Sequence, residues 1–150
     1  MINIKTSTIQ ELVIVRGHPG SGKSTLAAKF KEIGYKNFEN DDFFTDENGV
    51  YKFDIKFHQE AKDHCVNNVI NALKDSNSVV ASNTYTKISE MDDIINFAVS
   101  NNIPYRIFEM EYEFQNLHDV PDFVMEDKKK NFEKHPSAVI INKNDTYSVK

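Results

Sequence analysis

The feature that most constrains the fold is an aliphatic run that leads directly into a glycine-rich turn. The run is Leu12-Val13-Ile14-Val15, and the turn begins at Gly17. Consecutive aliphatic residues, most of them β-branched, are typical of a strand that is buried on both faces. Such a strand belongs to a parallel sheet with helices on each side, so the run favours an α/β protein.

Short strands and longer helices alternate along the rest of the chain. Because strands separated by helices form parallel β–α–β units with right-handed crossovers, the predicted fold class is α/β with three layers. Ligands in such sheets bind beyond the carboxyl ends of the strands. We expect strands at 12–15, 35–40, 78–82, 105–110 and 137–142, and helices at 24–33, at 54–74 and from Ser89 onward.

Composition limits the classes of protein that are compatible with this chain. Its 150 residues are 39% hydrophobic and 27% charged, as in one soluble globular domain. The single cysteine, Cys65, excludes an internal disulfide framework and a cysteine-based zinc site, and its place in an apolar helical stripe predicts a core residue. The N-terminal residues lack the apolar run of a signal peptide or a membrane span. We therefore expect a cytoplasmic protein without membrane contact (in the host cytoplasm for a phage-encoded chain).

The turn and the helix after it match a phosphate-binding pattern. Residues 17–25 read G-H-P-G-S-G-K-S-T, which is the Walker A pattern G-x-x-x-x-G-K-[S/T] between a strand and a helix. Glycines let the backbone wrap round a phosphate, and successive N–H groups and the helix N-terminus attract the anion. The predicted ligand is ATP or another nucleoside triphosphate with Mg²⁺. The predicted nucleotide-binding residues are Gly17, Pro19, Gly20, Ser21, Gly22, Lys23, Ser24 and Thr25.

Two of these residues carry specific roles in the pattern. Lys23 is expected to reach the β- and γ-phosphates, and the Ser24 hydroxyl is expected to ligate Mg²⁺. A chance glycine-rich turn is the alternative, and the strand-then-helix context argues against it.

Further short motifs accompany the loop between residues 11 and 135. They are N-D-D-F-F at 40–44, G-V-Y-K-F-D at 49–54, S-N-T-Y at 82–85 and H-D-V-P at 118–121. Together with residues 16–27 they resemble P-loop kinases of the polynucleotide kinase-like family, in the branch of phage polynucleotide kinase and the AAA-like domain of NEDD4-binding protein 2. The resemblance implies a P-loop NTPase fold with about five parallel strands flanked by helices. It also implies transfer of the ATP γ-phosphoryl group to a hydroxyl.

The resemblance also suggests an organisation and a catalytic base. A single domain over 1–150 would have an N-terminal arm at 1–10, a lid-like region at 111–130 and a tail at 143–150. Asp41 would be the base that accepts the hydroxyl proton, and a carboxylate at the carboxyl end of a strand near the phosphate loop fits that role. Asp42 would be a supporting or metal-linked group. The alternative is that both aspartates cap the next turn.

Several positions depart from the family pattern. Phe44 and Gln115 stand where arginines are expected, and Ser82-Asn83 stands where an acidic residue is common. Asn83 can hydrogen-bond to a hydroxyl or to water but brings no charge to Mg²⁺, and Tyr85 is a candidate for lining the acceptor pocket. The aromatic residues at 51, 53 and 57 either stack on a base or pack beneath the loop.

The charge distribution argues against a polyanionic substrate. Of the 18 basic residues only Arg16 and Arg106 are arginines, the net charge is −5, and the stretches 39–49 and 111–127 contain acids but no base. Nucleic acid would be repelled there. The compensating residues are Lys128, Lys129 and Lys130, which form either a solvated helix face or a substitute for the missing lid or substrate-phosphate cation.

The sequence therefore leaves three functions open. The resemblance favours a kinase for the 5′-hydroxyl of a polynucleotide or oligonucleotide. The charge favours a kinase for a small hydroxyl acceptor, such as a nucleoside or a metabolite alcohol. The missing arginines and Asn83 favour a nucleotide-binding regulatory module, or an ATPase, with little transferase activity.

Overall fold

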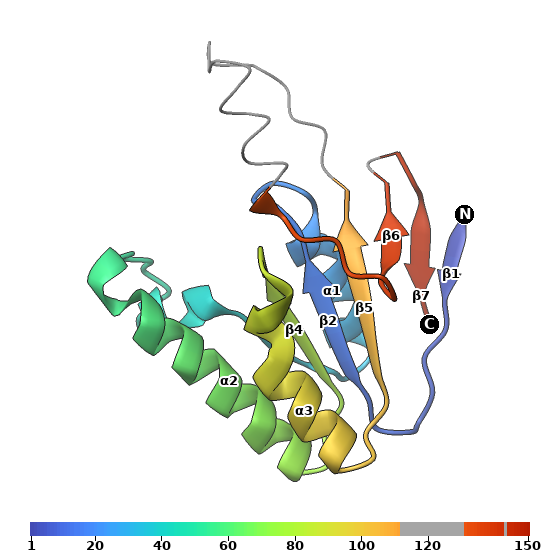
Figure 1. Ribbon diagram of the computed structural model, residues 1–150, viewed down its shortest axis with the longest axis horizontal. Coiled ribbons are helices and arrows are strands. Elements are labelled where there is room, and N and C mark those ends of the chain that lie inside the picture. The colour runs from blue at the N-terminus through green and yellow to red at the C-terminus, as the bar shows by residue number, and fades with distance from the viewer. Residues whose placement is uncertain (112–130, 143) are drawn as a thin grey trace.

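The computed structural model describes residues 1–111, 131–142 and 144–150, and it has the predicted three-layer α/β architecture (Figure 1). Five parallel strands form the central sheet in the order β3-β4-β2-β5-β6. Among the described residues, no helix has the length and apolar character needed to cross a bilayer. The strands are β2 (Leu12–Arg16), β3 (Lys36–Phe38), β4 (Val79–Asn83), β5 (Tyr105–Met110) and β6 (Val139–Ile141).

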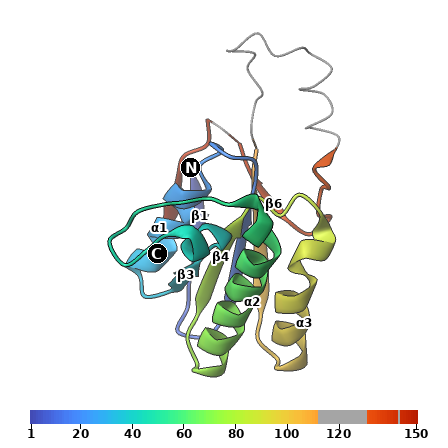
Figure 2. The ribbon, with the colours of Figure 1, turned by 90° about the vertical axis from the view of Figure 1, so that its left-hand side faces the viewer.

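Strand β2 lies at the centre of the sheet and contributes to the core on both of its faces. Leu12 and Ile14 pack with helices α2 (His58–Lys74) and α3 (Asp92–Ser100). Val13 and Val15 pack on the other face with helix α1 (Lys23–Glu32). All four side chains are fully buried, which stabilises the fold by about 1.5–3 kcal/mol for each. Figure 2 shows the sheet between α1 on one side and α2 with α3 on the other.

Helices α2 and α3 both begin later than the sequence indicates. The helix expected at 54–74 starts with a 3₁₀ turn at Ile55–Phe57, and α2 itself begins at His58. The helix expected from Ser89 also starts with a 3₁₀ turn, Ile88–Met91, and the Glu90 carboxylate caps this turn by accepting a hydrogen bond from the Lys87 N–H at 3.1 Å. Cys65 is a core residue of α2, as predicted, and burial raises the pKa of its thiol to about 11.

The two ends of the chain form a second sheet that the sequence pattern does not predict. Strands β1 (Ile2–Ile4) and β7 (Tyr147–Val149) pair in parallel, and the Thr6 N–H donates to the Lys150 carbonyl at 2.8 Å. These strands add apolar side chains, including the buried Ile4, to the layer that contains α1. Both termini therefore belong to the folded body (Figure 1).

A buried ion pair joins β2 to β5 directly below the glycine-rich loop. Arg16 is fully buried, and its guanidinium contacts the Glu109 carboxylate at 2.7 Å. The same guanidinium donates to the carbonyls of Tyr85, Thr86 and Glu133, and it lies 4.2 Å from the centre of the Phe132 ring. One side chain thus links two strands, the loop after β4 and the segment that begins at residue 131.

Removing either charge of this pair is expected to destabilise the fold strongly. Glu109→Gln leaves the Arg16 guanidinium buried without its counter-ion, so the free energy of unfolding should fall by about 3–5 kcal/mol. Urea denaturation followed by circular dichroism measures the change. The exposed Glu32→Gln is the matched control and should change stability by less than about 0.5 kcal/mol. A Glu109→Gln loss as small as the control would show that the pair is not structural.

Candidate functional site

The glycine-rich loop lies at the carboxyl end of β2 and passes directly into α1. Gly20 and Gly22 have φ angles of +80° and +95°, a region that favours glycine. A Cβ atom at Gly17 would lie 2.7 Å from the Ser21 Oγ and 3.0 Å from the Met110 carbonyl, so a side chain does not fit there. Glycine is therefore required at these positions of the loop for conformational or steric reasons.

Lys23 is held against the loop in the structure. Its Nζ donates to the His18 carbonyl at 3.0 Å. Burial lowers the pKa of the Lys23 ammonium, and the carboxylates of Glu39 and Asp41 act in the opposite direction. Ser21 has a buried hydroxyl without a hydrogen-bond partner among the described residues. Pro19, Ser24 and Thr25 are exposed, so the loop and the first turn of α1 present polar groups to solvent.

The two aspartates after β3 have different environments. Asp41 is exposed at the cleft, and its Oδ1 accepts a hydrogen bond from the Tyr51 hydroxyl at 3.2 Å. The Asp42 carboxylate instead accepts the N–H of Glu39 at 3.0 Å and so caps the 3₁₀ turn Asn40–Phe44. The capping alternative therefore describes Asp42, whereas the side chain of Asp41 is available to a substrate.

Glu39 is a site residue that the sequence reasoning did not single out. It follows β3 directly, is half-buried, and accepts a hydrogen bond from the Ser82 Oγ at 3.4 Å. Burial and the nearby carboxylates of Asp42 and Asp41 raise the pKa of Glu39, while Ser82 and Lys23 oppose the shift. Its position near the carboxyl end of a predicted strand is the sequence feature that indicates a site residue. The prediction instead assigned site roles to Asp41 and Asp42 of the adjacent Asp-Asp motif.

The residues that end β4 form the floor of the site. Asn83 is buried; its Oδ1 accepts the Asn40 N–H at 2.7 Å and its Nδ2 contacts the Cys65 Sγ at 3.7 Å. Tyr85 has a φ of +46°, which is unfavourable for a bulky residue, and Arg16 holds its carbonyl. Burial also raises the pKa of the Tyr85 phenol. Both side chains are therefore fixed within the fold.

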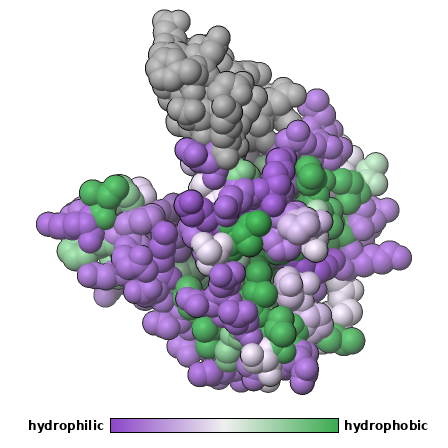
Figure 3. All heavy atoms as spheres, in the orientation of Figure 1, coloured by the Kyte–Doolittle hydropathy of each residue, from purple (hydrophilic) through white to green (hydrophobic). Residues whose placement is uncertain are grey.

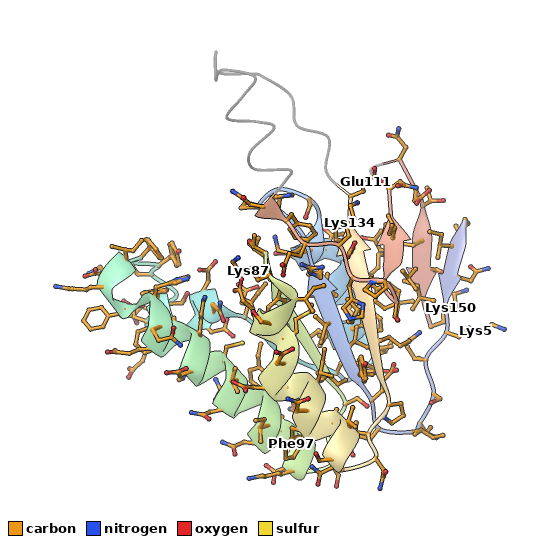
Figure 4. All side chains as sticks on the ribbon, viewed as in Figure 1. Lys5, Lys87, Phe97, Glu111, Lys134 and Lys150 are labelled. Atoms are coloured by element: carbon orange, nitrogen blue, oxygen red, sulfur yellow. The ribbon has the colours of Figure 1, made fainter. Side chains whose placement is uncertain are left out.

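These groups line one open cleft of about 760 Å³ at the carboxyl ends of the strands. The cleft brings together the loop residues Lys23 and Ser24, the carboxylates of Glu39 and Asp41, and the side chains of Asn83 and Tyr85. Figure 4 places Lys87 and Lys134 towards this end of the molecule and Phe97 at the opposite end. Seven of the twelve predicted site residues within the described ranges therefore line this cleft, namely Pro19, Gly20, Lys23, Ser24, Asp41, Asn83 and Tyr85.

Aromatic side chains form one wall of the cleft. Phe44 and Phe53 both line it, with their ring centres 5.1 Å apart. Phe44 is buried and packs against Tyr51 and Phe53 of the segment 45–53, whereas Phe53 is 52% exposed. Exposed apolar residues continue over the segment 50–57, where Figure 3 shows a hydrophobic patch on the protruding end before α2. Some of these aromatic side chains therefore pack inside the fold, as Phe44 does, and others are exposed to solvent, as Phe53 is.

The two arginines are both engaged inside the fold. Arg16 is buried against Glu109, and Arg106 contacts Glu11 at 2.6 Å near the amino ends of the strands. The other predicted cations, Lys128, Lys129 and Lys130, lie outside the described residues, as does Gln115. Within the described ranges, no group of three or more His, Cys, Asp or Glu side chains is arranged to hold a metal ion.

Comparison with known sequences identifies the family. The family model described as "AAA domain" matches residues 12–117. A Pasteurella multocida protein, "Uncharacterized protein PM0531", is 30% identical over 126 residues, which cover 75% of this chain and 70% of that protein.

Two further relatives are much longer than this chain. The bifunctional polynucleotide phosphatase/kinase of Schizosaccharomyces pombe is 32% identical over 110 residues, covering 73% of this chain and 23% of that protein. Human NEDD4-binding protein 2 is 34% identical over 99 residues, covering 64% of this chain and 5% of that protein.

Solved structures with the same fold include kinases. The APS kinase CysC of Mycobacterium tuberculosis, in complex with AMPPNP and APS, has a TM-score of 0.60 at 14% identity, covering 92% of this chain and 91% of that one. A chain of the Pnkp1/Rnl/Hen1 RNA repair complex has a TM-score of 0.63 at 19% identity, covering 85% and 45%. The chain therefore belongs to the AAA domain family, and its fold is that of the P-loop kinases.

Proposed function

We propose that the protein is an ATP- and Mg²⁺-dependent phosphotransferase that moves the γ-phosphoryl group to a hydroxyl. The observation that carries this proposal is that Lys23 of the phosphate loop and the exposed carboxylate of Asp41 line the same cleft. A kinase needs both groups within reach of one substrate, because the first stabilises phosphate charge and the second accepts the hydroxyl proton. The likeness to the fission yeast phosphatase/kinase favours the 5′-hydroxyl of a polynucleotide or oligonucleotide as the acceptor.

The loop would bind the nucleotide through its backbone N–H groups and through Lys23. On binding, the Lys23 Nζ would exchange the neutral His18 carbonyl for charged phosphate oxygens, which adds a direct counter-charge to a partly buried ammonium. The Ser24 hydroxyl and the nearby carboxylates are oxygen donors of the kind that Mg²⁺ prefers, so the donor set fits this ion. When bound with the nucleotide, Mg²⁺ would neutralise part of the charge that develops on the phosphates.

Asp41 would act on the acceptor. Its carboxylate takes the proton of the acceptor hydroxyl as that oxygen bonds to the γ-phosphorus, and the bond from the γ-phosphorus to the bridging oxygen breaks to release ADP. The Tyr51 hydroxyl donates to the Asp41 carboxylate and orients it. Tyr51 is therefore a positioning residue that connects the segment after the Asp-Asp motif to the reaction.

A small hydroxyl acceptor is the second candidate, and the structure of the cleft supports it. Both arginines are engaged elsewhere, and the cleft contains the carboxylates of Glu39, Asp41 and Glu90. The half-exposed ring of Phe53 offers an apolar surface to a planar group. An uncharged nucleoside fits these features better than a polyanion does.

One assay separates the candidate acceptors. The protein is incubated with γ-labelled ATP and with 5′-hydroxyl DNA, 5′-hydroxyl RNA or a panel of nucleosides. Label on an oligonucleotide end supports the first acceptor, and label on a nucleoside supports the second. Release of labelled phosphate without a labelled acceptor would identify an ATPase, and nucleotide binding without turnover would identify a regulatory module.

Lys23→Ala is expected to weaken ATP binding by about tenfold or more, because it removes the loop cation that compensates phosphate charge. Isothermal titration with AMPPNP measures the affinity. Lys31→Ala removes an exposed lysine from the same helix and is the matched control, with an affinity within about twofold of the wild type. Equal affinities for Lys23→Ala and the wild type would sink the assignment of the loop.

Asp41→Asn is expected to lower the rate of phosphoryl transfer by about 10²–10⁴-fold, because the amide cannot accept the proton. AMPPNP affinity should stay within about twofold of the wild type, which separates catalysis from binding. Asp75→Asn, at the far end of α2, removes the same charge outside the cleft and should leave the rate unchanged. Full transferase activity in Asp41→Asn would rule out this base.

A further inference from the structure

We infer that Glu39 supplies the protein carboxylate for the Mg²⁺ that accompanies the nucleotide, in place of an acid at the end of β4. This inference rests on the proposed function, since it assumes that a nucleotide occupies the loop. It concerns a residue that lies outside the Walker A pattern and the Asp-Asp motif.

The end of β4 cannot itself provide a charged ligand. β4 is the neighbour of β2 in the sheet, so its last residues lie beside the phosphate loop. These residues are Ser82 and Asn83, which are buried and uncharged. Both ends of the Asn83 amide are also engaged, since its Oδ1 accepts the Asn40 N–H and its Nδ2 contacts the Cys65 sulfur.

Glu39 reaches this position from the adjacent strand. β3 pairs with β4 in parallel, with Phe38 opposite Ala81, so the next residues along the two strands are Glu39 and Ser82. The Ser82 Oγ donates to the Glu39 Oε2 at 3.4 Å, which is a long hydrogen bond. The carboxylate therefore stands beside the residue that occupies the expected acidic position.

The Glu39 carboxylate lines the cleft, and it also takes part in the capping box that begins the turn after β3. The Asp42 N–H donates to the Glu39 carbonyl at 3.1 Å, and the Asp42 carboxylate accepts the Glu39 N–H at 3.0 Å. The turn is thus closed by the backbone and by the reciprocal capping of Glu39 and Asp42. Within the described residues, no lysine or arginine forms an ion pair with Glu39, although it lines the cleft with Lys23 and Ser24.

The local charge favours a divalent cation at this carboxylate. Glu39 is half-buried and lies close enough to Asp41 and Asp42 to be affected by both negative charges. Lys23 offsets only part of this negative charge, and a bound divalent cation would offset more of it. Mg²⁺ in nucleotide sites is held by one or two carboxylates together with the phosphates, so a single glutamate with the Ser24 hydroxyl is an adequate protein contribution.

The test uses Mn²⁺ as a spectroscopic substitute for Mg²⁺. Electron paramagnetic resonance of free Mn²⁺ gives its affinity for the complex of the full chain with AMPPNP, and isothermal titration gives AMPPNP affinity in EDTA. Glu39→Gln should weaken Mn²⁺ binding by about tenfold or more. Its metal-free AMPPNP affinity should be unchanged or higher, because a negative charge near the phosphates is removed.

Two further variants show whether a loss of Mn²⁺ affinity in Glu39→Gln comes from the missing charge of Glu39. Glu39→Asp keeps the charge and should retain Mn²⁺ affinity within about threefold, whereas an equal loss in both variants would overturn the inference. Glu47→Gln removes an exposed carboxylate of the same acidic stretch outside the cleft and should bind Mn²⁺ as the wild type does.

The outcomes separate this inference from the proposed function. If Glu39→Gln binds AMPPNP and also binds Mn²⁺ within twofold of the wild type, the role of Glu39 is wrong and the kinase proposal stands. If the wild type does not bind AMPPNP in EDTA or with metal, the proposed function fails and the inference fails with it.

Discussion

The site depends on the buried contact between Arg16 and Glu109. The cost of burying this ion pair is offset on the guanidinium side, because Arg16 also donates to the carbonyls of Tyr85 and Glu133, whereas the Glu109 Oε2 has no hydrogen-bond partner among the described residues. Glu109 in turn accepts the His135 N–H at 2.7 Å. The phosphate loop, the loop after β4 and the segment from 131 to 135 are therefore held by one group of charges. This arrangement uses an arginine for architecture in a chain that has only two.

The cleft contains both a loop cation and nearby carboxylates. Lys23 faces the carboxylates of Glu39 and Asp41, so the loop cation is already partly compensated before any nucleotide binds. A metal ion that arrives with the nucleotide would rebalance these charges, which connects the proposed role of Glu39 to the uncharged end of β4. The same negative groups disfavour a polyanionic acceptor, while the Phe44–Phe53 wall offers a surface for a planar one.

The relatives share the fold with this chain while their names give different acceptors. The match to the fission yeast phosphatase/kinase covers only 23% of that protein, and the APS kinase of Mycobacterium tuberculosis resembles this chain in fold at 14% identity. One fold can serve different acceptors, because function depends on the residues of the site and the fold alone does not set it. Acceptor choice is therefore expected to depend on the segments after β3 and β4, where this chain departs from the family pattern at Phe44 and at Ser82-Asn83.

The elements that could be predicted from the sequence are those with local signals. The aliphatic run of β2, the glycine-rich loop and the apolar stripe of α2 each specify their structure within a few residues, and the structure confirms all three. Contacts between groups that are distant in the chain could not be predicted in this way. The pairing of β1 with β7, the contact of Arg16 with Glu109 and the approach of Glu39 to Ser82 join residues far apart in the chain. Such contacts depend on strand order and register, because hydrogen bonding and burial act between neighbours in space, which a local pattern does not encode.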